Sequence, residues 1–431
     1  MMETLRGGGP GNPESNEKLK PVEVNFLKLG GTWDMVFRDG QKIGTGSLDD
    51  DTLLEIQTKA DYFTDDIKQT VVAERKLVAD LYVRFRNTKA EDKDVAEHLS
   101  SWAENKGEKL GDFVKGPFVP LFSGDSSHLR NSIIAPLIAN LIERAIQEPN
   151  KPILGGQGTD TADIALLGLF DVFTFDTRLP PLLLAGANRS HHESNSDAPR
   201  NFVDLAKLAH IDLGSGAFWI FQGNLYKASD FVKIDPEESR PVENQFTFFS
   251  AHKTNESVES ILDRAEKLKA NRQAHEVPPP AHIVHRINPE ALYDAFESVY
   301  TEDMGNQNSI PQLMPHIYDP RIKAIVVGAH SLGNVDNKTR WDLVQAAKRG
   351  KLVIDASRTL IGAATLDYAA SLLSANRNPK ELEGTGKTII SGHKLSKSMA
   401  RAVTVRAILE GLDQDQTQKL FDAYARSRRL A

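Results

Sequence analysis

The chain has 431 residues, a length that accommodates about two to three domains with a substantial buried core. Hydrophobic residues make up 40% of it and charged residues 26%, which fits a globular protein and excludes a wholly disordered one. The net charge of −7 does not indicate a phosphate-binding surface, so we expect no nucleic-acid partner. The absence of cysteine excludes disulfides, thiolate metal sites and cysteine nucleophiles.

The N-terminus is rich in glycine, proline and polar residues. Residues 1–20 (MMETLRGGGPGNPESNEKLK) lack the apolar core of a signal peptide, and we expect them to form a disordered tail. No later run approaches the ~18 consecutive apolar residues that a membrane span needs. These features predict a cytoplasmic protein without membrane association.

Short apolar runs that end in polar loops recur along the first half of the chain. The run VEVNFLKLGGTWDM, which starts at Val22, is typical of a strand that ends at two glycines and Thr32. Residues 49–75 are acidic and polar, and residues 76–113 are predicted to form a helix and a charged loop. A second strand and loop follow in FVPLFSGDSSHLR, residues 118–130. The next segment, NSIIAPLIANLIERAIQE, has the apolar spacing of an amphipathic helix.

Two further segments repeat the order of strand, loop and helix. They are PILGGQGTDTADIALLGLF (152–170) and PPLLLAGANRSHHESNSDAPRNFVDLAKLA (180–209). Strands that alternate with helices predict a mostly parallel sheet, whose sites lie at the carboxyl ends of the strands. Four polar loops are therefore expected to meet at one edge of this sheet.

The second half of the chain has the same alternation on a smaller scale. A β-rich stretch at 217–235 and a helix-like stretch at 257–273 precede three consecutive prolines, 278–280, which we interpret as a linker. We predict an α/β protein with a larger N-terminal parallel-sheet domain over residues 21–277 and a smaller C-terminal α/β domain over residues 281–431.

The loop GGQGTDTAD, residues 155–163, combines glycine, threonine and aspartate directly after a predicted strand. A hydroxyl nucleophile can hydrolyse an amide if a base takes its proton and hydrogen-bond donors hold the oxyanion. A partly desolvated lysine, whose pKa is lowered, can be that base, and an aspartate can orient it. Thr32, Thr159 and Asp160, together with a lysine, are candidates for this chemistry. Each motif alone has another interpretation, since GGT can be a simple turn, and DSS and GTDT can cap helices.

Taken together and in order, four motifs resemble the signatures of the bacterial-type L-asparaginase and glutaminase family. They are GGT (30–32), DSS (125–127), GTDTAD (158–163) and SDAPRNFVDLA (196–206). The segment GNLYKASDFVKID resembles the stretch that carries the family's catalytic lysine, which corresponds to Lys233. VVGAHSLGN and IDASRTLIGAAT resemble the family's Gly-Asn loop and Ser-Arg strand. The resemblance covers roughly residues 22–415 and implies the two-domain asparaginase-like fold.

The resemblance also implies a set of catalytic residues and an assembly. Thr32 is expected to be the nucleophile of the acyl-forming step, and Thr159, Asp160 and Lys233 to form a second catalytic group. The family's pattern implies neither a cofactor nor a metal, and it implies a homo-oligomer, either a dimer or a tetramer.

Substrate binding is implied for a second set of residues. Ser126 is expected to hold the substrate α-carboxylate with Ser127 beside it, and Asp160 to bind the α-ammonium. Gly31 and Gly158 are expected to let the backbone approach the substrate closely.

The HHE run at residues 191–193 is the one sequence feature that suggests a metal. It lies in a loop without a second histidine pair, and adjacent side chains are expected to point apart. We therefore predict no metal site there.

Three features depart from the family pattern. No tyrosine lies between Thr32 and Tyr62, although the family's first loop normally carries one that assists the nucleophile. Gln157 replaces the usual histidine before GTDT, and residues 60–117 contain an insertion that could be a lid, a partner surface or a changed substrate gate. The acidic residue that some members contribute across a subunit boundary has no match.

These observations predict an amidohydrolase that releases ammonia from L-asparagine, giving L-aspartate, through a threonine acyl-enzyme. The alternative is a non-catalytic or altered-specificity relative that binds an amino acid or a protein partner. The sequence leaves the choice between asparagine and glutamine open, because discrimination of one methylene amounts to only ~1–3 kcal/mol.

Overall fold

The structure, a computed structural model, describes most of the two halves of the chain. The described residues are 20–29, 36–38, 41–43, 67–99, 103–122, 129–158, 166–175, 177–187, 189–228, 231–235, 247–250, 256–264, 286–303, 310–329, 334–357, 371–378 and 380–427. The sheets and helices of the fold consist of these residues.

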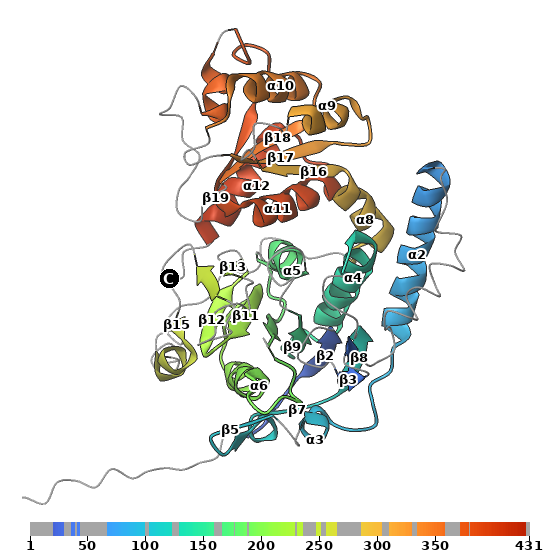
Figure 1. Cartoon of the computed structure of the whole chain (residues 1–431), viewed down its shortest axis with the longest axis vertical. Helices are drawn as coiled ribbons and strands as arrows, with labels where there is room; N and C mark the ends of the chain where they lie inside the picture. The colour runs from blue at the N-terminus through green and yellow to red at the C-terminus, as the bar shows by residue number, and fades with distance from the viewer. Residues whose placement is uncertain are drawn as a thin grey trace, which may run out of the picture.

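The first half contains a seven-stranded sheet with the spatial order β15-β12-β11-β10-β9-β2-β8 (Figure 1). Its strands are β2 (Asn25–Leu29), β8 (Phe118–Phe122), β9 (Ile153–Gln157), β10 (Leu182–Ala185), β11 (Ala217–Phe221), β12 (Asn224–Lys227) and β15 (Glu256–Ser257). The five neighbouring strands β8, β2, β9, β10 and β11 are parallel to one another. At one edge, β12 pairs antiparallel with β11, and β15 pairs antiparallel with β12. Nearly every residue of the parallel strands is buried, because helices cover both faces of the sheet. The predicted parallel sheet is thus confirmed.

Helices of the first half cover both faces of this sheet. They are α2 (Ile67–Asn87), α3 (Val95–Leu99), α4 (Asn131–Gln147), α5 (Leu166–Thr174) and α6 (Ala198–Leu208). Successive residues of β10 alternate between the two faces: Leu182 and Leu184 join the core with α4 and α5, whereas Leu183 and Ala185 join the core with α6.

The described part of the insertion at residues 60–117 packs against helices on both faces of the large sheet. α2 lies along α4 and begins at residue 67, earlier than the predicted start at 76. The rest lies by α6 and comprises α3, a hairpin of β5 (Glu104–Asn105) and β6 (Glu108–Lys109), η2 (Leu110–Asp112) and β7 (Val114–Lys115), which pairs with β1 (Val22–Glu23). The described part of the insertion is therefore integrated into the two cores.

The described residues of the first half also form two short antiparallel pairs. β3 (Val36–Arg38) pairs with β4 (Gln41–Ile43), and β13 (Phe231–Asp235) pairs with β14 (Thr247–Ser250). The predicted β-rich stretch at 217–235 therefore contains three strands, β11 to β13. Residues 258–264 are helical, as predicted for the beginning of 257–273.

The second half contains a four-stranded parallel sheet with the order β16-β17-β18-β19. Its strands are β16 (Val299–Asp303), β17 (Ala324–Ala329), β18 (Leu352–Ser357) and β19 (Ile389–Ser396). Its helices are α8 (Pro289–Glu297), α9 (Ile310–Tyr318), α10 (Asn337–Lys348), η6 (Leu372–Arg377), α11 (Lys397–Leu409) and α12 (Gln414–Ser427). Asn288, Asp336 and Ser396 cap α8, α10 and α11 through side-chain oxygens that accept backbone N–H groups.

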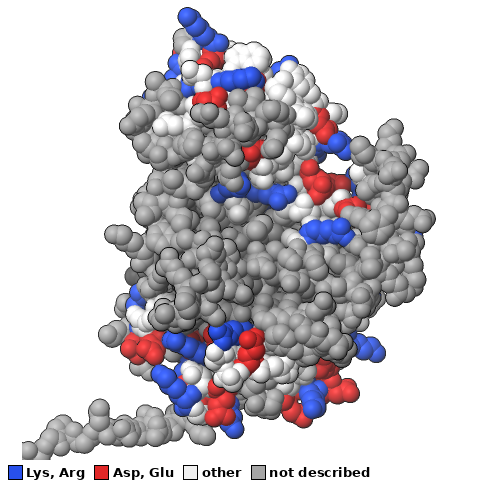
Figure 2. Space-filling view, viewed as in Figure 1, with Lys and Arg blue, Asp and Glu red and all other residues white. Residues whose placement is uncertain are grey.

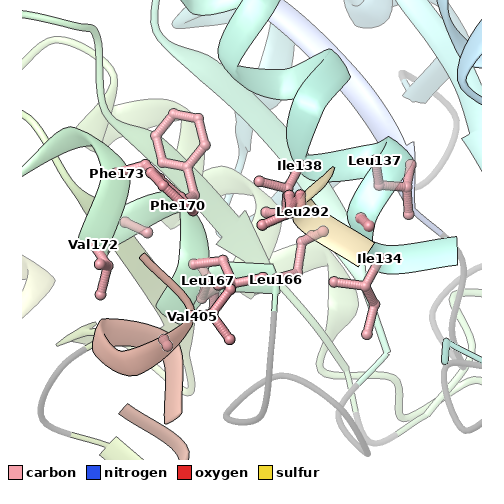
Figure 3. Packing of buried hydrophobic residues seen from close by; sticks show 14 of the residues in the cluster. Ile134, Leu137, Ile138, Leu166, Leu167, Phe170, Val172, Phe173, Leu292 and Val405 are labelled. Atoms are coloured by element: carbon pink, nitrogen blue, oxygen red, sulfur yellow. The ribbon is translucent and has the colours of Figure 1, made fainter. Parts of the chain in front are cut away.

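One hydrophobic core joins the two halves. α4 and α5 pack against α8 and α11, and Figure 3 shows Leu292 of α8 beside Ile138 of α4 and Leu166 of α5. The proline run predicted as a linker, residues 278–280, lies outside the described residues, as do residues 1–19 of the predicted tail. The domain division at 277 and 281 therefore stays a prediction.

Acidic and basic side chains are interspersed over the described parts of the face shown in Figure 2. Within the described residues, no helix combines the length and the apolar character that crossing a membrane requires.

Candidate active site

Three of the candidate loops begin at neighbouring strands of the large sheet. β2 lies between β9 and β8 and is parallel to both, so the carboxyl ends of the three strands share one edge. In the sequence, Thr32 is the third residue after β2, Ser126 the fourth after β8 and Thr159 the second after β9. Sites in parallel sheets form at such an edge. The expected convergence of these loops at one edge is therefore supported by the strand order.

Most of the candidate site residues lie outside the described residues. These are Gly31, Thr32, Ser126, Ser127, Thr159 and Asp160. Gly158 is described and buried at the end of β9. Lys233 lies on β13, and its backbone is paired with that of Phe248 on β14. The roles of all these residues stay predictions.

A glycine in β9 sets the close approach of β2 and β9. A Cβ atom on Gly155 would lie 2.6 Å from the carbonyl oxygen of Leu27 and 3.0 Å from Cδ2 of Leu184. Because the first of these atoms belongs to the backbone of β2, a side chain here would force the strands apart. Part of the glycine-rich sequence before GTDT thus serves strand packing, and this packing brings the starts of two candidate loops together.

The carboxyl ends of β9 and β10 are also tightly packed. Gln157, which departs from the family pattern, is fully buried. A Cβ atom on Gly186 would lie 2.9 Å from the carbonyl oxygen of Gln157 and 2.6 Å from the ring of Trp219. Glycine is therefore the residue that fits directly after β10.

The SDAPRNF signature shapes the loop that follows β10. Asn201 is fully buried; its side-chain amide donates to the carbonyl of Gly186 over 2.8 Å, and its side-chain oxygen accepts from the backbone N–H of Gln222 over 2.8 Å. The Ser196 hydroxyl donates to the carbonyl of Arg189 over 2.9 Å. The signature is recognisable in the sequence, but its structural role in the loop was not predicted. A buried asparagine within an amphipathic helix is the signal that could have indicated one, because its amide must find partners.

The two adjacent histidines do not point apart. The rings of His191 and His192 are 3.8 Å apart between centroids, with an angle of 39° between their planes, so this expectation was wrong. The tilted ring contact is local to the loop. Glu193 accepts from the backbone N–H of Ser190 over 3.0 Å. Among the described residues, no group of three or more His, Asp or Glu side chains could hold a metal ion.

A polar cluster lies at the first turn of α4, shortly after the DSS loop in sequence. The Asn131 amide donates to Oε1 of Glu297 over 2.5 Å, and the Tyr293 hydroxyl donates to Oε2 of Glu74. Burial raises the pKa of Glu74, and the hydrogen bond from Tyr293 and the charge of Arg130 oppose this effect. Burial and the Glu74 carboxylate also raise the pKa of Tyr293, so its hydroxyl stays protonated and donates.

The sequence matches the model of a known protein family. The family model described as asparaginase, N-terminal, matches residues 23–264, which is more than half of the sequence. The chain belongs to the asparaginase family. The strands that precede GGT, DSS and GTDTAD all lie within the matched region. No curated protein matches the sequence significantly.

Solved structures of L-asparaginases are similar to this asparaginase-family chain over nearly its whole length. A probable cytoplasmic L-asparaginase from Campylobacter jejuni gives a TM-score of 0.54 at 15% identity, covering 93% of this chain and 99% of the other. The thermostable L-asparaginase from Thermococcus kodakarensis gives 0.54 at 15% identity, with coverage of 93% and 97%. L-asparaginase I from Vibrio cholerae O1 biovar eltor gives 0.56 at 13% identity, with coverage of 96% and 98%. At these identities the likeness shows the fold, and it confirms the predicted two-domain asparaginase-like fold.

Proposed function

We propose that the protein is an amidohydrolase that releases ammonia from L-asparagine and leaves L-aspartate. The observation that carries the proposal is the arrangement of β9, β2 and β8 in an asparaginase-family chain. These adjacent parallel strands lead into the GTDTAD, GGT and DSS motifs, respectively. A fold shared at 13–15% identity does not by itself define a substrate. The motifs, at the strand ends where such sites form, support the amide assignment.

The proposed reaction has two steps. The Thr32 hydroxyl oxygen attacks the side-chain amide carbon to form a tetrahedral intermediate, and the hydroxyl proton passes to the leaving nitrogen. The C–N bond then breaks, which releases ammonia and leaves an ester on Thr32. Water then attacks the ester carbonyl, which releases aspartate and restores the threonine hydroxyl. Thr159, Asp160 and Lys233 form the second catalytic group, in which the lysine is the base. Backbone N–H groups of the Thr159 loop hold the oxyanion that develops in each step.

The proposed substrate contacts follow from the charges of an amino-acid amide. Ser126 and Ser127 bind the α-carboxylate, and Asp160 binds the α-ammonium. Gly31 and Gly158 leave room for the backbone beside the substrate. The reaction needs no cofactor. Because no tyrosine lies between Thr32 and Tyr62, we propose that deprotonation of Thr32 depends on a different base from that of the family.

We further propose a cytoplasmic homo-oligomer whose chains each have a domain over residues 21–277 and another over 281–431. The alternative function is binding of an amino acid or a protein partner without catalysis. The departure in the first loop favours this alternative, since the family's usual proton acceptor is missing. The retention of two threonines, an aspartate and a lysine at the motif positions favours catalysis.

Ammonia release by the purified full-length chain tests the proposal. We expect turnover of L-asparagine, slower turnover of L-glutamine, and losses of at least about a hundredfold in kcat for Thr32→Ala and Thr159→Ala. Thr385→Ala is the matched control, because this exposed threonine lies in the second half and donates only locally, to the carbonyl of Leu382. Failure of the wild type to hydrolyse either amide, together with stabilisation by free amino acids in thermal unfolding, would establish the binding alternative instead.

A further inference from the structure

The insertion helix α2 lies where the two halves of the protein meet. It packs against α4 of the first half and α8 of the second. Its buried stripe includes Leu77, Val78, Leu81 and Phe85, all fully inaccessible to solvent. A stripe of this kind fixes the helix firmly, because the burial of each apolar side chain stabilises its packed position.

In its N-terminal half, α2 contacts α8 through two pairs of side chains. Glu74 contacts Tyr293, and Arg75 contacts Asp294. Glu74 accepts the hydroxyl of the buried Tyr293. Arg75 binds the Asp294 carboxylate through two hydrogen bonds, of 2.9 and 2.8 Å. The Arg75 and Asp294 side chains are 50% and 42% exposed, so this ion pair adds specificity of position more than stability.

Toward its C-terminal end, α2 contacts α4 and the segment that enters α8. The Tyr82 hydroxyl donates to Oε2 of Glu143 on α4 over 2.7 Å, and it accepts from the Arg286 guanidinium over 3.1 Å. Arg286 lies three residues before α8 begins at Pro289. One hydroxyl group thus joins α2, α4 and the entry to α8.

α8 in turn holds the first turn of α4. Asn131, the first residue of α4, donates to Glu297 at the end of α8. The Arg401 guanidinium from α11 lies 4.5 Å from the centre of the Phe296 ring, next to Glu297 in the sequence of α8. A movement of α8 would therefore move the start of α4, which follows Ser127 by four residues in the sequence.

We propose that α2 is a positioning element that fixes α8 against the first turn of α4 and thereby sets the substrate affinity of the asparaginase site. The proposal rests on the proposed function, in which Ser126 and Ser127 bind the substrate α-carboxylate. Glu74, Arg75 and Tyr82 are positioning residues, because they act through α8 and α4. A displacement of about 1 Å at a substrate-binding group is sufficient to reduce the efficiency of an enzyme strongly.

The variants Tyr293→Phe and Asp294→Arg test the proposal in the full-length protein. The first removes the hydroxyl that Glu74 accepts, and the second places a like charge opposite Arg75. We expect KM for asparagine to rise by about three- to thirtyfold with kcat within about twofold of the wild type. The charge-swapped double variant, Asp294→Arg with Arg75→Asp, is expected to regain most of the lost affinity.

The control is Arg321→Ala, which breaks a bidentate ion pair between the exposed Arg321 and the half-buried Asp319 in the second half. It is expected to leave KM unchanged. Unaltered KM in both test variants, or an equal rise in the control, would overturn the proposal. A fall in melting temperature without a change in KM would also overturn it and assign α2 a purely structural role.

Hydrogen exchange separates this proposal from the proposed function. We expect the backbone amides of residues 131–135 and 137, in the first two turns of α4, to exchange at least about threefold faster in Tyr293→Phe and Asp294→Arg than in Arg321→Ala. If the wild type hydrolyses no amide but the exchange rates change as expected, the asparaginase assignment fails while the positioning of α4 by α2 stands. Unchanged exchange at the start of α4 would overturn the positioning role whether or not the protein is active.

Discussion

Replacement of Asn201 by alanine is expected to destabilise the protein strongly. The side chain is fully buried and makes two 2.8 Å hydrogen bonds, to the carbonyl of Gly186 and from the backbone N–H of Gln222. Asn201→Ala leaves both backbone groups without these partners. Each unsatisfied buried group costs about 1–3 kcal/mol, and partial access of water to the vacated space lowers the sum, so we expect a loss of about 2–4 kcal/mol.

Equilibrium unfolding in urea measures this loss. Trp219, whose buried ring is packed against Gly186, makes tryptophan fluorescence a suitable probe. Asn378→Ala is the matched control, since the Asn378 side chain also accepts a backbone N–H, from Lys380, but at an exposed turn. We expect the control to lose less than about 1 kcal/mol. A loss for Asn201→Ala no larger than that of the control would refute the assignment of a structural role to the SDAPRNF signature.

Three further changes give predictions of different kinds. Burial raises the pKa of Asp355 well above its ordinary value of 3.8, and neither of its carboxylate oxygens has a hydrogen-bond partner among the described residues. The folded protein therefore keeps this proton to higher pH than the unfolded chain, so the wild type loses stability as the pH rises above about 4, by at most about 1.4 kcal/mol per unit. Asp355→Asn is expected to gain stability relative to the wild type over this range, and parallel pH profiles of urea unfolding would show the reasoning to be wrong. Tyr424→Phe removes the hydroxyl that donates to the buried Asp171 carboxylate, and urea unfolding is expected to show a loss of about 1–3 kcal/mol. Gly155→Ala places a methyl group against the Leu27 carbonyl and is expected to lower both the melting temperature and ammonia release; wild-type values for both would contradict the packing role of this glycine.

The strands of the large sheet were predictable because burial on both faces gives continuous apolar runs. The segments that became β8 and β10 have this character, and the helix that became α4 has a regular apolar stripe. The start of α2 was not predictable in the same way. Residues 67–75 mix polar and apolar residues, because the helix buries only a stripe. That stripe packs against α4 and α8, helices far away in the sequence.

The candidate site was predictable as a set of motifs, whereas the contacts that support it were not. The motif residues are recognisable from their order along the chain. The partners of Asn201 and Tyr293 depend on tertiary packing; Tyr293, for example, binds a residue 219 positions away. The ring contact between His191 and His192 likewise depends on the conformation of one loop, which alternation along an extended chain does not describe.

The order of the strands indicates the orientation of the substrate in the proposed function. β2 lies between β8 and β9, so the loop with Thr32 begins between the loops with Ser126 and Thr159. Neighbouring strands are about 4.8 Å apart, which places the starts of the outer two loops about 10 Å apart. In the proposed reaction, asparagine would lie across these strand ends, with its α-carboxylate toward the β8 loop and its amide carbon toward the β2 loop.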